Sequence, residues 1–158
     1  MTRGRSPANQ PLAKACSGLP PLFDGTSEET QAKVADIFRT RVFDRGQLLF
    51  VAGNIADRAY FVLSGYVSPL AENEIGRDIT VVVNTRGETV HPESLVTQIY
   101  TCRAKTTADS TISYLPKSVF FEVIHGYPRL AMNVLSGMAV ATSRHSPLLS
   151  KPAGRPGG

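Results

Sequence analysis

The sequence predicts a mainly β fold with flanking α-helices, in the form of an antiparallel β-roll or jelly roll followed by a C-terminal helix. Between residues 41 and 115, short runs of β-branched and aromatic residues are separated by glycines, a pattern typical of antiparallel strands. The segments between these runs are too short to hold the crossover helices that a parallel sheet needs. Helical periodicity precedes this region and returns after it.

Composition fits one globular domain between two flexible ends. The chain has 158 residues, of which 42% are hydrophobic and 19% are charged, and this is enough for a single buried core. Residues 1–21 and 146–158 are rich in proline and glycine and lack apolar periodicity. We therefore expect a flexible basic N-terminal tail, a folded domain over residues 22–145, and a disordered C-terminal tail.

The net charge of +4 comes from the two ends of the chain. Residues 1–22 and 144–158 together carry six basic residues and no acidic residue, which leaves 11 basic and 13 acidic residues between them. A basic groove for nucleic acid is therefore not expected on the folded part. No apolar run reaches the roughly 18 residues of a membrane span, and two cysteines are too few for a secreted disulfide scaffold. These features predict a cytoplasmic protein with reduced thiols and no membrane partner.

The first element is expected to be an amphipathic helix in the segment TSEETQAKVADIF, residues 26–38. Thr26 and Glu29 have the spacing of a capping box, in which the two side chains bond reciprocally to backbone N–H groups of the first turn. Val34, Ile37 and Phe38 fall on one face of this helix. The helix should therefore pack on the rest of the domain through that apolar stripe.

Four runs are expected to form strands, and two later segments are expected to form helices. The strand runs are QLLFVA (47–52), AYFVLS (59–64), DITVVVN (78–84) and STISYL (110–115). After them, PKSVFFEVIHG predicts a short helix that ends at Gly126. Pro128 then opens a longer helix over residues 128–145, since proline is favoured in a first helical turn. One face of that helix carries Leu130, Val134, Met138 and Ala141.

The stretch RGQLLFVAGNIADRAYFVLSGYV, residues 45–67, resembles the signature of the cyclic nucleotide-binding domain of the catabolite activator/FNR (Crp/Fnr) family of bacterial regulators. GRDITVV (76–82), TRGE (85–88) and ADSTISYLPKSVF (108–120) are similar to the segments that follow in that family. The resemblance covers about residues 22–143. It implies a non-catalytic regulatory sensor domain, with a jelly-roll effector pocket closed by a phosphate-binding cassette.

The resemblance places the effector pocket at Val90, His91, Glu93, Ser94, Leu95, Tyr100, Thr101 and Arg103. The glycine and glutamate of the family's cassette fall on His91 and Pro92, and its arginine falls on Tyr100. A cyclic phosphate carries a full negative charge, which cannot enter an apolar barrel without donors and a countercharge. Arg103 should point to the face opposite Tyr100, because side chains alternate along a strand. We therefore expect that ordinary cAMP binding has been lost.

Three other interpretations of the pocket stay open. The chain could bind a cyclic nucleotide after all, as a fragment of a transcription regulator. It could be a haem-based gas or redox sensor with His91 as an iron ligand, because relatives in this family take an axial ligand from the same loop and imidazole binds haem iron. It could also be a ligand-free protein-interaction module in which Ile99 and Tyr100 fill the pocket. The sequence shows no other metal site, since an iron–sulfur cluster needs four thiolates and the chain has two cysteines.

The helix over residues 128–145 corresponds to the element that pairs two subunits in the family. The resemblance therefore implies a homodimer formed through Leu130, Val134, Met138 and Ala141, with a small-molecule effector or a protein as further partner. Residues 146–158 are too few for a recognition helix, so no DNA-binding domain is expected in this chain. The sequence contains no nucleophile elbow, HExxH motif or P-loop, and we do not expect an enzyme.

Overall fold

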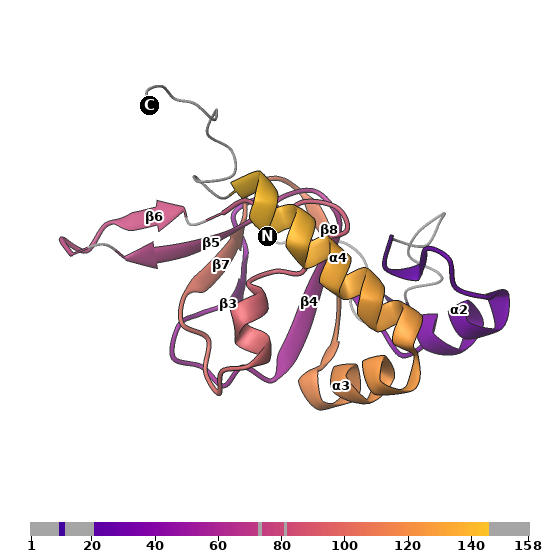
Figure 1. The fold of residues 1–158 in the computed structure, drawn as a ribbon. Coiled ribbons are helices and arrows are strands. Elements are labelled where there is room, and N and C mark those ends of the chain that lie inside the picture. Colours follow the sequence, from indigo (N-terminus) through magenta and orange to yellow (C-terminus); the bar gives the residue numbers. More distant parts are fainter. Residues whose placement is uncertain (1–9, 12–20, 73, 81, 146–158) are drawn as a thin grey trace, which may run out of the picture.

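Two four-stranded antiparallel sheets form a roll, and helices pack on one side of it (Figure 1). This computed structural model describes residues 10–11, 21–72, 74–80 and 82–145. The strands lie in the order β1-β2-β8-β4 in one sheet and β3-β7-β5-β6 in the other. The arrangement confirms the predicted fold class, a mainly antiparallel β-roll followed by a C-terminal helix.

Most strands lie in the middle of the chain, and the α-helices lie before and after them, as the sequence pattern predicts. They are β1 (Gln10–Pro11), η1 (Pro21–Phe23), α2 (Glu28–Ala35), β2 (Arg39–Phe43), β3 (Leu48–Phe50), β4 (Arg58–Ser64), β5 (Val67–Glu72), β6 (Asp78–Thr80), η2 (Pro92–Leu95), β7 (Arg103–Thr106), β8 (Ser110–Pro116), α3 (Lys117–Gly126) and α4 (Pro128–His145). The four predicted runs overlap β3, β4, β6 and β8. The β5–β6 hairpin projects from the roll (Figure 1).

The first helix begins one residue later than the sequence predicts. The N-cap of α2 is Ser27, whose hydroxyl accepts a hydrogen bond from the backbone N–H of Thr30 at 3.1 Å. The Thr26 hydroxyl instead donates to the carbonyl of Phe23 at 2.6 Å. Since Thr26 is used in the preceding turn, the predicted capping box between Thr26 and Glu29 is wrong. Of the predicted apolar stripe, Val34 and Phe38 are buried, whereas Ile37 is exposed.

The N-terminal segment departs from the prediction at one place. Gln10 and Pro11 form β1, which pairs with Thr40 and Arg39 on the edge of the first sheet. These two residues therefore do not belong to a free tail, because the open edge of β2 offers backbone groups with which they pair. Residues 1–9, 12–20 and 146–158 of the predicted tails lie outside the described residues.

The buried side chains form two clusters on the two faces of the first sheet. The helix-side core contains Phe23, Val34, Phe38, Phe61, Leu63, Leu115, Phe120, Val123, Leu130 and Val134, with several smaller members. The roll interior contains Phe43, Phe50, Ala56, Tyr60, Val62, Val67, Val90, Tyr100, Cys102, Ala104, Ile112 and Tyr114. The alternation of side chains along β4 and β8 sends neighbouring residues into different clusters. The resemblance to the cyclic nucleotide-binding domain implies an effector pocket in the roll interior.

The turn after β4 requires glycine at residue 65. Substitution there should therefore destabilise the fold more than substitution of Gly46, which also has positive φ. Gly65 has φ +93°, and a Cβ atom there would lie 2.2 Å from the Ser110 hydroxyl oxygen and 2.7 Å from the Asp109 carbonyl oxygen. Gly46 has φ +86°, but a Cβ atom there would meet nothing within 4 Å. We expect Gly46→Ala to lower the free energy of unfolding by about 1–2 kcal/mol through backbone strain alone. Gly65→Ala should lower it by about 3 kcal/mol or more.

Urea denaturation followed by circular dichroism measures both losses under one set of conditions. Equal losses for the two alanine variants would contradict the close approach of Gly65 to the Asp109–Ser110 backbone.

Candidate functional site

The segment from Glu88 to Thr101 forms the cassette, the name used here for the part that covers the free edge of β4. The N–H of Val62 donates to the Glu88 carbonyl at 3.1 Å, and the N–H of Val90 donates to the Tyr60 carbonyl at 2.9 Å. The chain then forms the short helix η2 and returns to the roll, where the N–H of Tyr100 donates to the Asn54 carbonyl at 2.9 Å. The cassette is thus bonded to the roll at both of its ends.

His91 has an unusual backbone conformation within the cassette. Its φ of 48° places it in the left-handed region, and it is the one non-glycine residue with positive φ in the described part of the chain. This conformation is natural for glycine, the residue that the family resemblance places here. Nε2 of His91 lies 3.0 Å from the Thr101 hydroxyl oxygen, and Nδ1 lies 3.3 Å from Oε1 of Glu93. Both ring nitrogens therefore have partners within the cassette.

Tyr100 closes the roll at the position that the resemblance assigns to arginine. The side chain is buried, and its ring stacks on Phe50 with the centroids 3.9 Å apart and the planes 10° from parallel. Its hydroxyl donates to the Arg58 carbonyl at 3.2 Å and accepts from the Arg58 N–H at 3.4 Å. Burial raises the pKa of Tyr100 to about 12. The site therefore presents a neutral ring where a guanidinium would be needed to neutralise a phosphate.

Side chains of the chain itself fill the space around Tyr100. Phe50 also contacts Tyr60, and Tyr60 contacts Tyr114, with centroid distances of 5.8 and 6.0 Å. Tyr100 therefore packs among other aromatic side chains of the roll interior. The prediction that Ile99 fills the pocket is wrong, because Ile99 is 46% exposed and forms an isolated bridge with Ile55 at the rim of the roll. The two residues differ because neighbouring side chains in this extended segment point to opposite sides.

Two of the three cations near the cassette, Arg103 and Lys117, have partners outside the roll interior. Arg103 on β7 is hydrogen-bonded to Asp78 on β6, as expected for a side chain on the face opposite Tyr100. The guanidinium of Arg58 lies over the ring of Tyr114, 4.8 Å from its centroid. Lys117 Nζ donates to the carbonyls of Ser94 and Thr97 at 2.8 and 2.7 Å. Arg103 and Lys117 therefore direct no positive charge to Tyr100, whereas the Arg58 guanidinium lies beside the aromatic cluster to which Tyr100 belongs.

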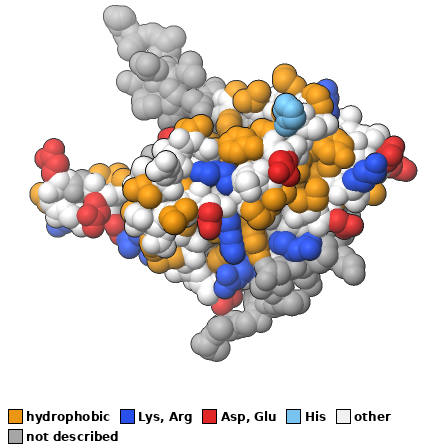
Figure 2. All heavy atoms as spheres, turned by 90° about the horizontal axis from the view of Figure 1, so that it is seen from below, with side chains coloured by type: hydrophobic (Ala, Val, Ile, Leu, Met, Phe, Trp, Pro, Cys, Tyr) orange, Lys and Arg blue, Asp and Glu red, His pale blue; other side chains and the backbone are white. Residues whose placement is uncertain are grey.

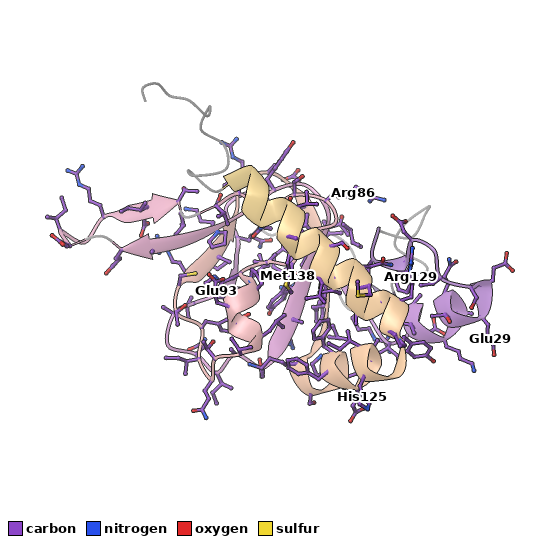
Figure 3. The ribbon with its side chains drawn as sticks, viewed as in Figure 1. Glu29, Arg86, Glu93, His125, Arg129 and Met138 are labelled. Atoms are coloured by element: carbon purple, nitrogen blue, oxygen red, sulfur yellow. The ribbon has the colours of Figure 1, made fainter. Side chains whose placement is uncertain are left out.

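The remaining predicted pocket residues divide between core and solvent. Val90 is buried in the roll interior, and Leu95 is buried in the helix-side core. Ser94 is buried, whereas Thr101 is exposed. The Glu93 side chain is 67% exposed and contacts His91, so it is not directed into the roll. Figure 3 shows Glu93 on η2 and Met138 on α4.

Two spaces adjoin this region. A void of about 10 Å³ between α4 and β4 has room for about one water molecule and is lined by Leu22, Phe61, Val62, Gly87, Thr89, Asn133 and Val134. A wide-open depression of about 530 Å³ lies at the rim and is lined by Leu49, Phe50, Gly53, Asn54, Ile55, Asp57, Arg58, Tyr60 and Tyr100. Each lining includes one residue of the cassette, Thr89 in the void and Tyr100 in the depression, and neither includes a residue of η2.

The structure corrects the residues expected to pair two subunits. Leu130 and Val134 are buried in the chain's own helix-side core, and Met138 is partly buried against it. Asn133 holds the same part of α4 in place, because its Nδ2 donates to the carbonyls of Leu22 and Asp24 at 2.7 and 2.8 Å. Leu130 and Val134 are therefore unavailable to a second copy. Ala141 lies outside the part of α4 whose side chains are described.

The described residues offer few groups for other chemistry. Among them, no three His, Cys, Asp or Glu side chains gather closely enough to bind a metal ion. Within the same ranges, no helix has the length and apolar character needed to cross a membrane. Cys102 is buried in the roll interior, and burial raises the pKa of its thiol. In this position Cys102 packs as a small apolar residue.

Sequence reasoning did not single out three residues that shape the site. Phe50 and Arg58 provide the ring and the backbone groups that hold Tyr100, but their patterns are those of ordinary strand residues. Lys117 carries a detectable signal, because a cation in the first turn of a helix opposes the helix dipole.

The sequence matches the family model of the cyclic nucleotide-binding domain over residues 40–127, which is more than half of the chain. No curated protein sequence matches it. The fold is similar to that of the catabolite activator protein of Thermus thermophilus, with a TM-score of 0.65 and 24% identity over 81% of this chain and 60% of the activator. The chain thus spans 60% of the length of that activator.

Two further solved structures have the same fold. The sensor domain of the transcriptional regulator DNR from Pseudomonas aeruginosa has a TM-score of 0.61 and 16% identity, over 84% of this chain and 90% of that one. The regulatory subunit of a cAMP-independent protein kinase A from Trypanosoma brucei has a TM-score of 0.61 and 14% identity, over 82% of this chain and 45% of the subunit. The roll, the cassette and the matched sequence agree, and the chain belongs to the cyclic nucleotide-binding domain family, with Crp/Fnr-type sensor domains among its structural neighbours.

Proposed function

We propose that this chain is a non-catalytic, homodimeric regulatory domain whose pocket does not take an ordinary cyclic mononucleotide. The observation that carries the proposal is the position of Tyr100, which stacks on Phe50 and bonds to the Arg58 backbone inside the roll. These contacts occupy the place where an effector phosphate and its countercharge would otherwise meet. The regulatory role itself follows from membership of the family.

The energetic argument depends on charge. A cyclic phosphate that leaves water loses the hydrogen bonds of its hydration shell. Donors and a cation in the site must replace those interactions. Tyr100 is neutral at physiological pH, since its pKa is raised to about 12. Pro92 has no backbone N–H to offer in η2, and the Glu93 side chain faces solvent beside His91. Binding would also require the Phe50–Tyr100 stack to open, which adds a further unfavourable step.

The same contacts argue against haem. An iron ligand needs a free imidazole nitrogen directed into a cavity wide enough for a porphyrin. His91 uses one nitrogen towards Thr101 and the other towards Glu93, and its ring centroid lies 6.3 Å from that of Phe50. The residues present therefore do not fit haem, and the two interpretations that remain are a different effector and a protein partner.

Exposed apolar side chains support a role in protein contacts. Figure 2 shows the face that carries α3, on which hydrophobic side chains alternate with charged side chains of both signs. Phe121 on α3 is 42% exposed. One structural neighbour, the kinase regulatory subunit from Trypanosoma brucei, is described as cAMP-independent, which is consistent with use of this fold without that ligand.

The homodimer is proposed to form through the outer face of α4. Met132 and Leu135 are 56% and 58% exposed, and Ala139 is exposed beside them. Their spacing of i, i+3 and i+7 places them in one stripe. That stripe lies opposite Leu130 and Val134, which face the roll. One helix can therefore pack on its own roll and still present an apolar seam to a second copy.

The pocket proposal is tested by isothermal titration calorimetry of the purified chain with cAMP and with cGMP. We expect no saturable heat at ligand concentrations up to about 1 mM. A dissociation constant of about 1 mM corresponds to a binding free energy of about 4 kcal/mol, and the site without a countercharge should provide less than this. A thermal-shift screen that adds cyclic dinucleotides and haemin extends the test to other effectors. Saturation by either mononucleotide in the micromolar range would refute the proposal.

The neutral state of Tyr100 predicts a pH dependence of stability. The Tyr100 phenol has a pKa of about 12 in the folded chain, whereas the pKa of a tyrosine in the unfolded chain is near its ordinary value of 10.0. The unfolded state is therefore favoured as the pH rises, so the stabilisation is complete below pH 10 and decreases between pH 10 and 12. Urea denaturation across this range should show a smaller decrease for Tyr100→Phe than for wild type.

Tyr66→Phe is the matched control, since Tyr66 is 50% exposed. It should follow the wild-type pH dependence, and a decrease in Tyr100→Phe as large as in wild type would show that the Tyr100 phenol is not protected.

The dimer proposal predicts that a charge in the outer seam separates the subunits. Leu135→Glu should convert a dimer of about 34 kDa into a monomer of 17.0 kDa in light scattering coupled to size-exclusion chromatography, because carboxylates would face each other across an apolar interface. Ile75→Glu is the control, since Ile75 is 74% exposed at the β5–β6 turn. A wild-type chain that is monomeric, or a Leu135→Glu variant that remains dimeric, would exclude this interface.

A further inference from the structure

Lys117 connects three segments that are distant in the sequence. It is the first residue of α3, and its backbone N–H donates to the Asp57 carbonyl in the loop before β4 at 2.8 Å. Its Nζ donates to the carbonyl of Ser94 at 2.8 Å and to the carbonyl of Thr97 at 2.7 Å. One side chain thus bonds to the cassette on both sides of Val96.

A lysine at this position is unfavourable for α3 itself. The N-terminus of a helix carries a partial positive charge, which favours Asp or Glu in the first turn and disfavours Lys. The first turn of α3 contains no acidic residue, and Pro116 provides no side-chain cap. A residue that is unfavourable for its own helix can be retained because it gains stabilising contacts elsewhere in the fold. Here that gain is the pair of bonds to the cassette.

The two carbonyls that Lys117 contacts lie where η2 ends. A short helix leaves its last carbonyls without partners inside the helix, and a buried carbonyl without a donor destabilises the fold. Ser94 is buried, so water cannot easily replace Lys117 there. Hydrogen bonds from an ammonium group are about twice as strong as neutral ones. Lys117 therefore supplies the hydrogen-bond donors that the carbonyls at the end of η2 need.

The contacts of Lys117 join the cassette to the helices. The hydrogen bonds from Ser94 to His91 and from Val96 to Glu93 stay within the cassette. Lys117 instead belongs to α3, whose Phe120 and Val123 pack with Leu130 of α4 in the helix-side core. Movement of the cassette away from the roll must break both Lys117 bonds, and movement of α3 must pull on them.

We infer that Lys117 is a strap that holds the cassette closed on the roll and couples its position to that of α3. The inference rests on the proposed function only in treating the cassette as the part that moves when an effector or a partner binds. The strap itself requires no ligand. It acts through two charge-assisted bonds to backbone carbonyls, so any residue that keeps the charge and the donors should retain it in part.

Hydrogen–deuterium exchange followed by mass spectrometry tests the strap on the full chain without ligand. Lys117→Met keeps the length of the side chain and removes the donors. We expect the amides of residues 93–100 to exchange about tenfold faster or more in this variant, because their local opening no longer breaks the two bonds. Lys117→Arg should remain close to wild type. Lys33→Met, which removes an exposed lysine paired with Glu29 at 3.3 Å, should change nothing in the cassette.

The location of any change distinguishes a strap from a general structural role. Peptides from β8 and from residues 119–126 of α3 should keep their wild-type exchange in Lys117→Met. Unchanged exchange over residues 93–100, an equal increase throughout α3 and β8, or an arginine variant as fast as the methionine variant would each overturn the inference. Because no nucleotide is present, the result is independent of the calorimetric test of the pocket, and either proposal can fail alone.

Discussion

The arrangement of this domain depends on the stacking of Tyr100 on Phe50 inside the roll. The ring is held from one side by Phe50 and at its hydroxyl by the Arg58 backbone, so it is fixed in both position and orientation. Tyr100 thereby joins an aromatic cluster with Phe50, Tyr60 and Tyr114, and its phenol is neutral and buried. The proposed loss of cyclic-nucleotide binding rests on this place, because a phosphate there would have to displace the stacked ring.

The fold could be predicted from the sequence because its signals are local. Runs such as AYFVLS and STISYL are rich enough in β-branched and aromatic residues to identify β4 and β8, and Gly65 marks a turn in which only glycine fits. The start of α2 was missed by one residue, because Thr26 and Ser27 have equal capping chemistry and only the preceding turn decides between them. A choice of this kind depends on contacts outside the helix itself, here that of the Thr26 hydroxyl with the Phe23 carbonyl.

The site could be predicted only in part, for the same reason. The substitution of tyrosine for arginine is visible in the sequence, but the partners of Tyr100 come from β3 and β4 and are known only from the fold. The face of α4 that packs inward was correctly identified as apolar, yet its assignment to subunit contact was wrong for Leu130 and Val134. Helical periodicity shows that a face is apolar and does not show what covers it. Two apolar stripes on one helix need the structure to tell them apart.

The aromatic cluster also determines what can be seen by optical spectroscopy. The chain has no tryptophan and five tyrosines, and three of these, Tyr60, Tyr100 and Tyr114, lie together in the roll interior. The near-ultraviolet absorption and emission of the protein therefore originate largely from this one buried group. Rearrangement of the interior changes that signal directly, so the domain carries its own chromophore at the place where its regulatory state would be set.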